Sequence, residues 1–160
     1  MVTNLVIHES SKIELVLTRI YHAPRALLFK AWTDSRLLSK WWGPKDFTNP
    51  ICIIDPYRGG LLFINMTAPD GTQYPTNGVI HEISPPDRLV FATTGFEDEI
   101  GRPLLQVLNT VSFAGLKRKT KLTLHVVVVK AGPEIKFALD GMDEGWNQSL
   151  DRLGNQVESK

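Results

Sequence analysis

The sequence is poor in cysteine, in excess charge of either sign and in long apolar runs. Cys52 is the only cysteine among 160 residues, so no disulfide can form within the chain and no CxxC pair exists for a metal or redox centre. The sequence has eighteen Lys and Arg residues and seventeen Asp and Glu residues. This near balance of charge argues against nucleic-acid binding through bulk positive charge. The most apolar stretch, 122–129, is far shorter than the roughly 20 residues of a membrane-spanning helix. Residues 1–10 lack the basic start and apolar core of a signal peptide, so we expect a cytoplasmic protein without a membrane partner.

Motifs for catalysis and metal binding are missing too. The sequence contains no GxSxG elbow, no glycine-rich phosphate loop and no HxxxH or HExxH pair. The one basic run, 117–119, has the form of a solvated hairpin turn rather than a nucleic-acid patch. Cys52 lies in an apolar segment, where a buried and inert thiol is the expectation. These absences predict neither metal nor cofactor, and they favour a protein without catalytic activity.

What is present predicts one α+β domain over residues 1–160, large enough to fold without a disulfide or metal. Residues 1–11 form a polar arm, and the branched residues of 13–20 predict a first strand. Pro24 suits the first turn of a helix over 25–32, and Thr33, Asp34 or Ser35 can cap a second short helix that reaches Trp41. Six further antiparallel strands are expected at 51–54, 61–66, 76–83, 88–94, 105–113 and 121–129. The total is seven strands.

A long helix follows Gly132-Pro133. Its apolar residues fall on one stripe, formed by Ile135, Leu139, Met142, Trp146, Leu150, Leu153 and Val157. Such a stripe needs an apolar partner, and the sheet is the only candidate. Gly141 and Gly145 each cost about 1 kcal/mol relative to alanine inside a helix, so Gly141 marks a place for a kink or a late start. Beside the stripe, Ala138, Gly145 and Ser149 either let the helix approach the sheet closely or leave volume open.

Three segments carry a family resemblance. They are APRALLFKAWTDSRLLSKWWGP at 23–44, APDGTQYPTNGVIHEISPPDRLVF at 68–91 and GMDEGWNQSLDRL at 141–153. Together they resemble the family named after the activator of the Hsp90 ATPase, in its small one-domain form, over about residues 13–157. The resemblance implies the helix-grip fold of the START/Bet v 1-like (SRPBCC) superfamily. Lipid-transfer, plant-allergen and aromatase/cyclase-like domains of that group share an apolar cavity between a curved sheet and the last helix.

Alternation along the strands predicts which side chains face the last helix. The predicted inner face consists of Leu62, Ile64, Met66, Leu89, Phe91, Thr93, Val107, Asn109, Val111, Phe113, Leu122, Leu124, Val126 and Val128. Asn109 is a polar residue on an apolar face, so it either bonds a neighbour or meets a ligand. His81 alternates with Val79 and Ile83, which suggests an inward side chain. The opposite phase, with Ile80 and Glu82 inward, stays open.

Aromatic residues complete the predicted site. Trp41 and Trp42 follow the second helix, where they form either core or a lip that stacks on a ligand. Trp146 either packs on the sheet or floors a cavity. The predicted ligand-binding residues are Trp41, Trp42, Leu62, Ile64, Met66, His81, Phe91, Thr93, Asn109, Val111 and Trp146.

The leading functional hypothesis is the binding of a small hydrophobic or aromatic molecule, without catalysis. One alternative is a cyclase- or hydrolase-like enzyme that uses a cavity histidine or carboxylate. Another, suggested by the family name, is a chaperone-interaction module with a role in stress. Leu61 and Phe63 alternate with the inward residues, so they point to the outer face, which is normally polar in an antiparallel sheet. Either the first two helices cover them or a second subunit does. The helices of this fold are expected over the mouth of the sheet rather than its back, so we favour a second subunit in a homodimer.

Overall fold

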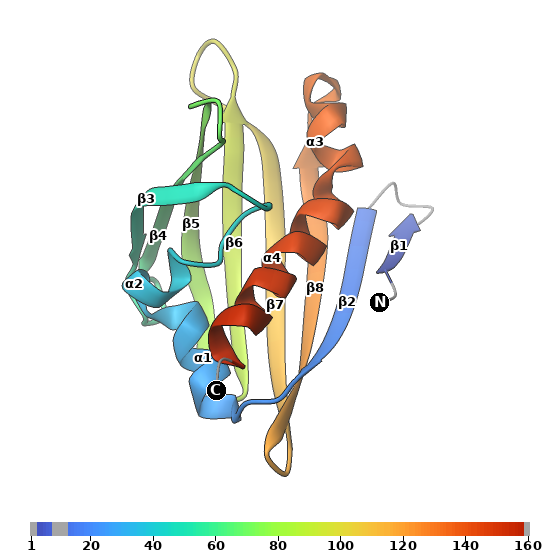
Figure 1. The fold of residues 1–160 in the computed structure, drawn as a ribbon. Helices are drawn as coiled ribbons and strands as arrows, with labels where there is room; N and C mark the ends of the chain where they lie inside the picture. Colours follow the sequence, from blue (N-terminus) through green and yellow to red (C-terminus); the bar gives the residue numbers. More distant parts are fainter. Residues whose placement is uncertain (1–2, 8–12, 159–160) are drawn as a thin grey trace.

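A curved antiparallel sheet holds a long helix against its inner face (Figure 1). The computed structural model describes residues 3–7 and 13–158. The strands are β1 (Thr3–Ile7), β2 (Ile13–Tyr21), β3 (Thr48–Ile54), β4 (Leu61–Thr67), β5 (Gln73–Ser84), β6 (Arg88–Glu97), β7 (Pro103–Leu116) and β8 (Lys119–Ala131). The helices are α1 (Arg25–Thr33), α2 (Ser35–Leu38), the 3-10 turn η1 (Pro133–Ile135), α3 (Lys136–Asp140) and α4 (Met142–Val157). The strand order is β1-β2-β8-β7-β6-β5-β4-β3.

The predicted α+β helix-grip architecture is confirmed, and the seven predicted strands are β2–β8. The polar arm is wrong in one part: Thr3–Ile7 forms β1, which pairs antiparallel with β2 from Thr3 opposite Leu17 to Ile7 opposite Ile13. The other arm residues, 1–2 and 8–11, lie outside the described residues. β1 supplies partners to backbone groups of β2 that would otherwise form an open sheet edge.

The two short helices occur in the predicted order, and the second is shorter than predicted. Asp34 is the cap of α2, since its carboxylate accepts from the backbone N–H groups of Arg36 at 3.0 Å and Leu37 at 3.1 Å. α2 ends at Leu38 rather than Trp41, and residues 39–41 continue as a turn. The long final helix is interrupted at Gly141, as the sequence predicts, and α3 and α4 lie on either side of that residue.

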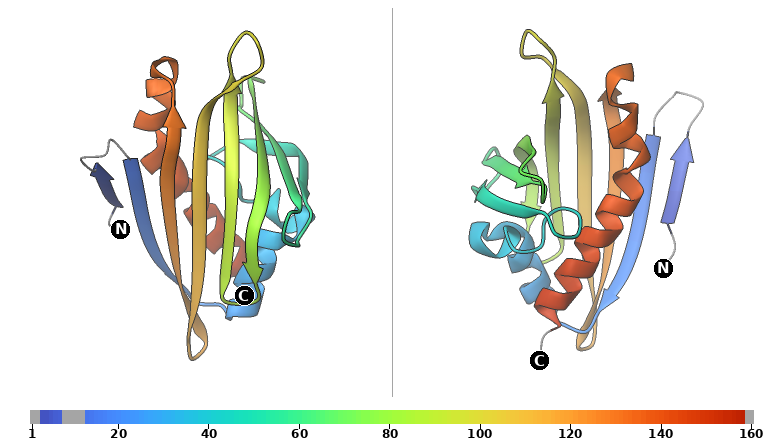
Figure 2. Two further views of the ribbon diagram at one scale, coloured as in Figure 1. Left: turned by 180° about the vertical axis from the view of Figure 1, so that it is seen from behind. Right: turned by 45° about the horizontal axis from the view of Figure 1, so that its top comes forward.

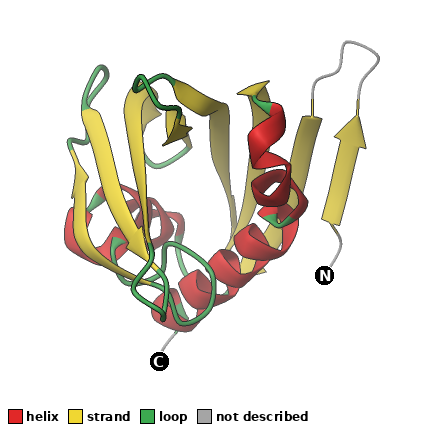
Figure 3. Cartoon of the chain, turned by 90° about the horizontal axis from the view of Figure 1, so that it is seen from above, coloured by secondary structure: helices red, strands yellow, loops and turns green. Residues whose placement is uncertain are grey.

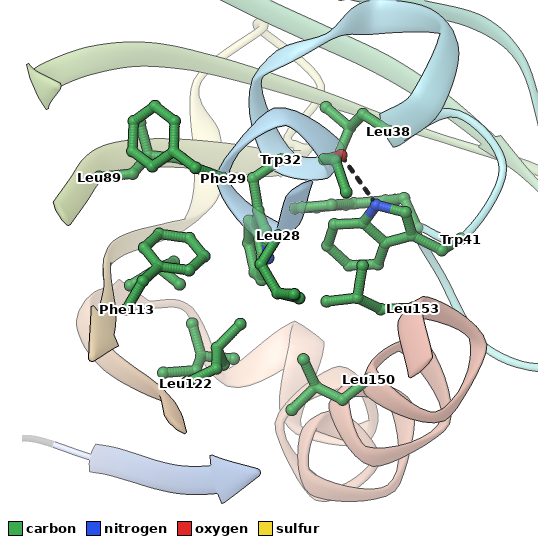
Figure 4. Close-up of a cluster of buried hydrophobic side chains, with 14 of the residues drawn as sticks. Leu28, Phe29, Trp32, Leu38, Trp41, Leu89, Phe113, Leu122, Leu150 and Leu153 are labelled. Atoms are coloured by element: carbon green, nitrogen blue, oxygen red, sulfur yellow. Dashed lines mark hydrogen bonds between the residues drawn. The ribbon is translucent and has the colours of Figure 1, made fainter. Parts of the chain in front are cut away.

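The core fills only one end of the space between sheet and helices. Figure 4 shows it at the C-terminal half of α4, where α1 and α2 also pack. Its labelled members are Leu28, Phe29, Trp32, Leu38, Trp41, Leu89, Phe113, Leu122, Leu150 and Leu153, all buried. The predicted inward phases of β4, β6, β7 and β8 are confirmed by burial, with Met66 half-buried at the end of its strand.

Polar contacts fix α4 to the neighbouring strand β2. The Tyr21 hydroxyl donates to the Leu150 carbonyl at 2.8 Å, and burial raises the pKa of that phenol. Arg19 forms an ion pair with Asp151 at 2.7 Å. From behind, the sheet shows its outer face with α1, α2, α3 and α4 on the opposite side (Figure 2). Among the helices described, none has the length and apolarity needed to cross a membrane.

Candidate ligand-binding cavity

The other end of the grip contains a cavity of about 720 Å³. It lies between α3, the first turns of α4 and the strands β5, β6 and β7, whose relative positions are seen from above in Figure 3. From the helix side it is lined by Phe137, Ala138, Gly141, Met142, Gly145, Trp146 and Ser149. The sheet contributes segments at 73–77 and 93–97 together with Met66, Pro103, Leu105, Val107 and Asn109, and the loop after α2 contributes Trp42, Gly43, Pro44 and Phe47.

Four aromatic residues of the cavity lining contact one another in sequence. Ring centroids are 6.2 Å apart for Phe47 and Tyr74, 6.2 Å for Tyr74 and Phe96, and 5.6 Å for Phe96 and Phe137. Phe137 is 62% exposed, so this row of rings reaches solvent on the α3 side. Phe96 has φ of 55°, an uncommon backbone conformation for a residue other than glycine and one often found at ligand-contacting positions.

Trp146 forms the boundary between cavity and core. It stacks on Trp32 with centroids 6.1 Å apart and meets Trp42 edge-on at 5.2 Å. Trp32 is fully buried, whereas Trp146 is half-buried and lines the cavity. The indole therefore packs on buried aromatic residues with one part and bounds the open volume with another.

The small residues of the last helix leave volume open. Ala138, Gly145 and Ser149 all line the cavity, which decides between the two sequence-based alternatives. A Cβ added at Gly145 would meet Pro44 at 3.8 Å, an ordinary van der Waals contact. The helix thus does not need glycine there for close approach to its neighbours.

Side chains of α4 hold the loop that contributes residues 42–44 and Phe47 to the cavity lining. Arg152 Nη1 donates to the carbonyls of Trp42, Gly43 and Pro44 at 3.1, 3.0 and 3.0 Å, and its Nη2 donates to that of Lys40 at 3.1 Å. Burial lowers the pKa of the Arg152 guanidinium.

Two further contacts fasten the same loop. Ser149 Oγ accepts from the Gly43 N–H at 3.1 Å, and Gln148 Oε1 accepts from the Lys45 N–H at 2.9 Å. The position of Trp42 in the cavity wall therefore depends on polar groups of α4.

Of the polar side chains in the cavity lining, those of Thr93, Asn109 and Ser149 are buried; the others are Gln73, Tyr74, Thr76, Asn77, Thr94 and Glu97. Asn109 is 2% exposed, and its Nδ2 donates to the Phe91 carbonyl and to Thr93 Oγ1, both at 3.2 Å. Glu97 is the one charged residue in the lining, and it is exposed. A largely apolar wall with a small number of polar groups is typical of sites for small organic ligands.

Five of the predicted site residues line the cavity: Trp42, Met66, Thr93, Asn109 and Trp146. Five others lie in the core instead: Trp41, Leu62, Ile64, Phe91 and Val111. Trp41 is fully buried, its ring contacts Trp32 at 4.6 Å, and its indole N–H donates to the Ala31 carbonyl at 3.0 Å. Trp41 is thus a structural residue next to a cavity-lining one.

The inward orientation of His81 is wrong. His81 is exposed and lies at an irregularity between Ile80, which pairs with Phe91, and Glu82, which pairs with Val90. A bulge adds one residue to a strand and reverses its alternation. Ile80 before the bulge is buried and Ile83 after it packs on the core, so His81 between them points outward.

Several lining residues were missed by sequence reasoning. Phe47, Tyr74, Phe96 and Phe137 come from a loop, two strand ends and a short helix, where no periodicity marks a common face. Only Ala138, Gly145 and Ser149 indicated open volume in the sequence, and they were equally compatible with close approach of the helix to the sheet.

Groups suited to acid–base or nucleophilic chemistry lie mostly away from the cavity. Cys52 does not line it, and burial raises the pKa of its thiol to about 11. His125 contacts Glu14 at 3.3 Å, and neither residue belongs to the lining. Within residues 3–7 and 13–158, no three His, Cys, Asp or Glu side chains come together as metal ligands would.

Comparison with known proteins places the chain in a family. The model of the family described as "Activator of Hsp90 ATPase homolog 1-like protein" matches residues 22–158. The chain belongs to this family. The Hsp90-activator-like domain therefore accounts for α1 through the end of α4. A search of the curated proteins found no match.

Solved structures share the fold of this Hsp90-activator-like domain. A protein from Arthrobacter aurescens is 25% identical, with a TM-score of 0.79 over 98% of this chain and 90% of that one. A protein from Mycobacterium smegmatis is 24% identical, with a TM-score of 0.77 over 99% and 98%. The AHSA1 protein from Silicibacter pomeroyi is 23% identical, with a TM-score of 0.75 over 90% and 96%.

Proposed function

We propose that this protein binds a small hydrophobic or aromatic molecule in the cavity between α3–α4 and β5–β7. The observation that carries the proposal is the cavity itself: about 720 Å³, walled by aromatic and aliphatic side chains, with one charged residue in its lining. Ligand pockets typically enclose about 300–1,000 Å³ and are mostly apolar with a few polar groups. The residues proposed to contact the ligand include Trp42, Met66, Thr93, Asn109 and Trp146.

Binding without chemistry is favoured over catalysis. A cyclase- or hydrolase-like enzyme would need a general acid or base within reach of the bound molecule. His81, the predicted candidate, is exposed on the other side of its strand, and Glu97 is exposed at the cavity edge. The lining offers mainly apolar contact with several hydrogen-bonding side chains, which suits a carrier or sensor of the cytoplasm.

The outer face supports a second proposal, that two copies associate. Apolar side chains gather there on β3, β4 and β5: Ile51, Ile53, Leu61, Phe63 and Val79. Ile53 pairs with Phe63 and Leu61 with Val79, so four of them are direct neighbours on adjacent strands. Contiguous exposed apolar surface is typical of protein interfaces, and β3 is the sheet's outermost strand on this side. A chaperone is the alternative occupant of this surface.

Titration with Nile red, a neutral environment-sensitive dye, tests the cavity. We expect saturable binding near one equivalent with a dissociation constant in the micromolar range, about −8 kcal/mol. Gly145→Leu places a side chain into the open volume and should abolish binding, because only Pro44 lies within 4 Å of the added Cβ. Asn155→Leu is the matched control, since it adds the same side chain on the exposed face of the same helix.

Two results would contradict the cavity proposal. One is the absence of saturable binding to the wild type. The other is equal binding by wild type and by a folded Gly145→Leu variant, which would put the dye on the surface. Native mass spectrometry of freshly purified protein, with a retained small molecule, would identify the ligand.

A further inference from the structure

The polar pair inside the cavity has an unused hydrogen-bonding capacity. Asn109 Nδ2 faces two oxygens, the Phe91 carbonyl and Thr93 Oγ1. A carbonyl oxygen can only accept, so the amide must present its nitrogen on this side and its Oδ1 on the other. Within the described chain no group donates to Asn109 Oδ1, and Asn109 is one of the residues that line the cavity.

Thr93 has the complementary capacity. Its Oγ1 accepts from Asn109 Nδ2, so its own hydroxyl hydrogen is available for a second partner. Thr93 and Asn109 lie on adjacent strands, and both line the cavity. Side by side, they present one donor and one acceptor to whatever occupies the space between them and Trp146.

The side chains that line the cavity limit which polar group a ligand can place beside Thr93 and Asn109. The lining contains no Lys, Arg or His, so a carboxylate would enter without a cation to pair with and would face the Oδ1 lone pairs. An ether or ketone could accept from Thr93 and would leave Oδ1 without a donor. A hydroxyl group satisfies both atoms, because its oxygen accepts while its hydrogen donates.

We propose that the ligand is a neutral aromatic or apolar molecule with a hydroxyl group, which accepts from Thr93 Oγ1 and donates to Asn109 Oδ1. This inference rests on the proposed function and names the chemical class for that site. The aromatic side chains around the pair would contact the rest of the molecule.

Three pyrene probes of one shape test the inference: 1-hydroxypyrene, 1-methylpyrene and 1-pyrenecarboxylate. Binding is followed by pyrene emission and by quenching of tryptophan fluorescence, since Trp42 and Trp146 line the cavity, at a pH where the phenol is neutral. We expect 1-hydroxypyrene to bind about tenfold tighter than 1-methylpyrene, the range that one or two net hydrogen bonds provide. The carboxylate should bind more weakly than both.

Variants separate the polar pair from the apolar walls. Thr93→Val and Asn109→Leu keep side-chain size, and each should remove most of the preference for 1-hydroxypyrene while 1-methylpyrene binds as before. Unchanged binding of the methyl probe also shows that the variant is folded. Thr110→Val makes the same replacement on the opposite face of β7 and should keep the preference. If Asn109→Leu does not fold, Thr93→Val alone decides.

The outcomes distinguish this inference from the proposal beneath it. Equal affinity for the hydroxyl and methyl probes, or tightest binding of the carboxylate, overturns the hydroxyl assignment and leaves the cavity proposal standing. A preference that persists in Thr93→Val also overturns the assignment. Failure of all three probes to bind overturns the cavity proposal and this inference together.

Discussion

Arg152 does not line the cavity, but it holds in place a loop whose residues do. Its guanidinium donates to four backbone carbonyls of the segment between α2 and β3. Among the described residues, the carbonyls of Lys40 and Gly43 have no other donor. The carbonyl of Trp42 also accepts from Asn49 Nδ2 at 2.7 Å, and that of Pro44 accepts from the Phe47 N–H at 3.1 Å. Trp42 and Pro44 thereby keep their places in the cavity lining although the segment has no regular structure.

Replacing Arg152 by methionine should cost about 1.5–3 kcal/mol of unfolding free energy, because hydrogen bonds from a charged donor are lost and several carbonyls lose a partner. The apolar stem is kept, so the loss reports the guanidinium. Chemical denaturation measures the effect, and Nile red binding should weaken in parallel. Arg36→Met, at an exposed position of α2, should stay within about 0.5 kcal/mol of wild type. A stable Arg152→Met protein with intact dye binding would show that the loop holds itself in place.

At the scale of elements, two glycines mark breaks in regular structure, Gly141 between α3 and α4 and Gly43 in the loop before β3. They differ in whether the backbone there requires glycine. Gly141 has φ of −92°, which any residue adopts, and a Cβ there would lie 3.7 Å from the Phe137 carbonyl. Gly43 has φ of 99°, in the left-handed region, and its Cβ would lie 2.9 Å from the Met66 sulfur. Only the second position requires glycine.

Alanine at these two positions should therefore act in opposite directions. Gly141→Ala should stabilise the protein by about 0.4–1 kcal/mol, since it lowers the entropy of the unfolded chain without strain. Gly43→Ala should destabilise it by at least about 1 kcal/mol through backbone strain and contact with Met66. Urea denaturation of the two variants and wild type gives the comparison. A destabilised Gly141→Ala would mean that α3 and α4 need a conformation at their junction that alanine resists.

Sequence reasoning succeeded for elements whose residues repeat and failed where one residue breaks the repeat. The inward residues of β7 follow from strict alternation, because Val107, Asn109, Val111 and Phe113 share one phase without interruption. In β5 a single extra residue at His81 reverses the phase, and nothing in the sequence marks it. Both phases considered for that strand are partly correct, one on each side of the bulge.

At the scale of the whole molecule, the sequence predicts the fold well and the cavity poorly. The order of elements and the apolar stripe on the last helix determine the helix-on-sheet architecture, since few arrangements bury that stripe on one sheet. The cavity depends on a balance of volumes: Trp41 fills space, and Trp42, one residue later, bounds it. Periodicity cannot predict such a balance, because it shows which way a side chain points and not how far away the opposite element lies.

The proposed dimer is tested by sedimentation. Leu61 is 61% exposed on an outer face that none of the described helices covers, and burial of this group of side chains would favour association. We expect wild type to sediment as a dimer in the micromolar range and Leu61→Glu/Phe63→Glu to sediment as a monomer. Thr18→Glu, an exposed position on β2 far along the sheet order, is the control and should leave the dimer intact. A wild type that stays monomeric at high micromolar concentration refutes the dimer, and a dimeric double variant moves the interface elsewhere.

The separation of the core from the cavity bears on how this domain can evolve. The buried cluster contacts the C-terminal half of α4, whereas the cavity lies beside α3 and the first turns of α4. Replacements at Phe47 or Tyr74, which line the cavity and lie outside the buried cluster, would therefore alter the shape of the cavity while the cluster around Trp32 keeps the chain folded. Under the proposed function, a lineage could in this way exchange one ligand for another while the domain stays folded, and the same separation makes the domain a suitable starting point for designed receptors.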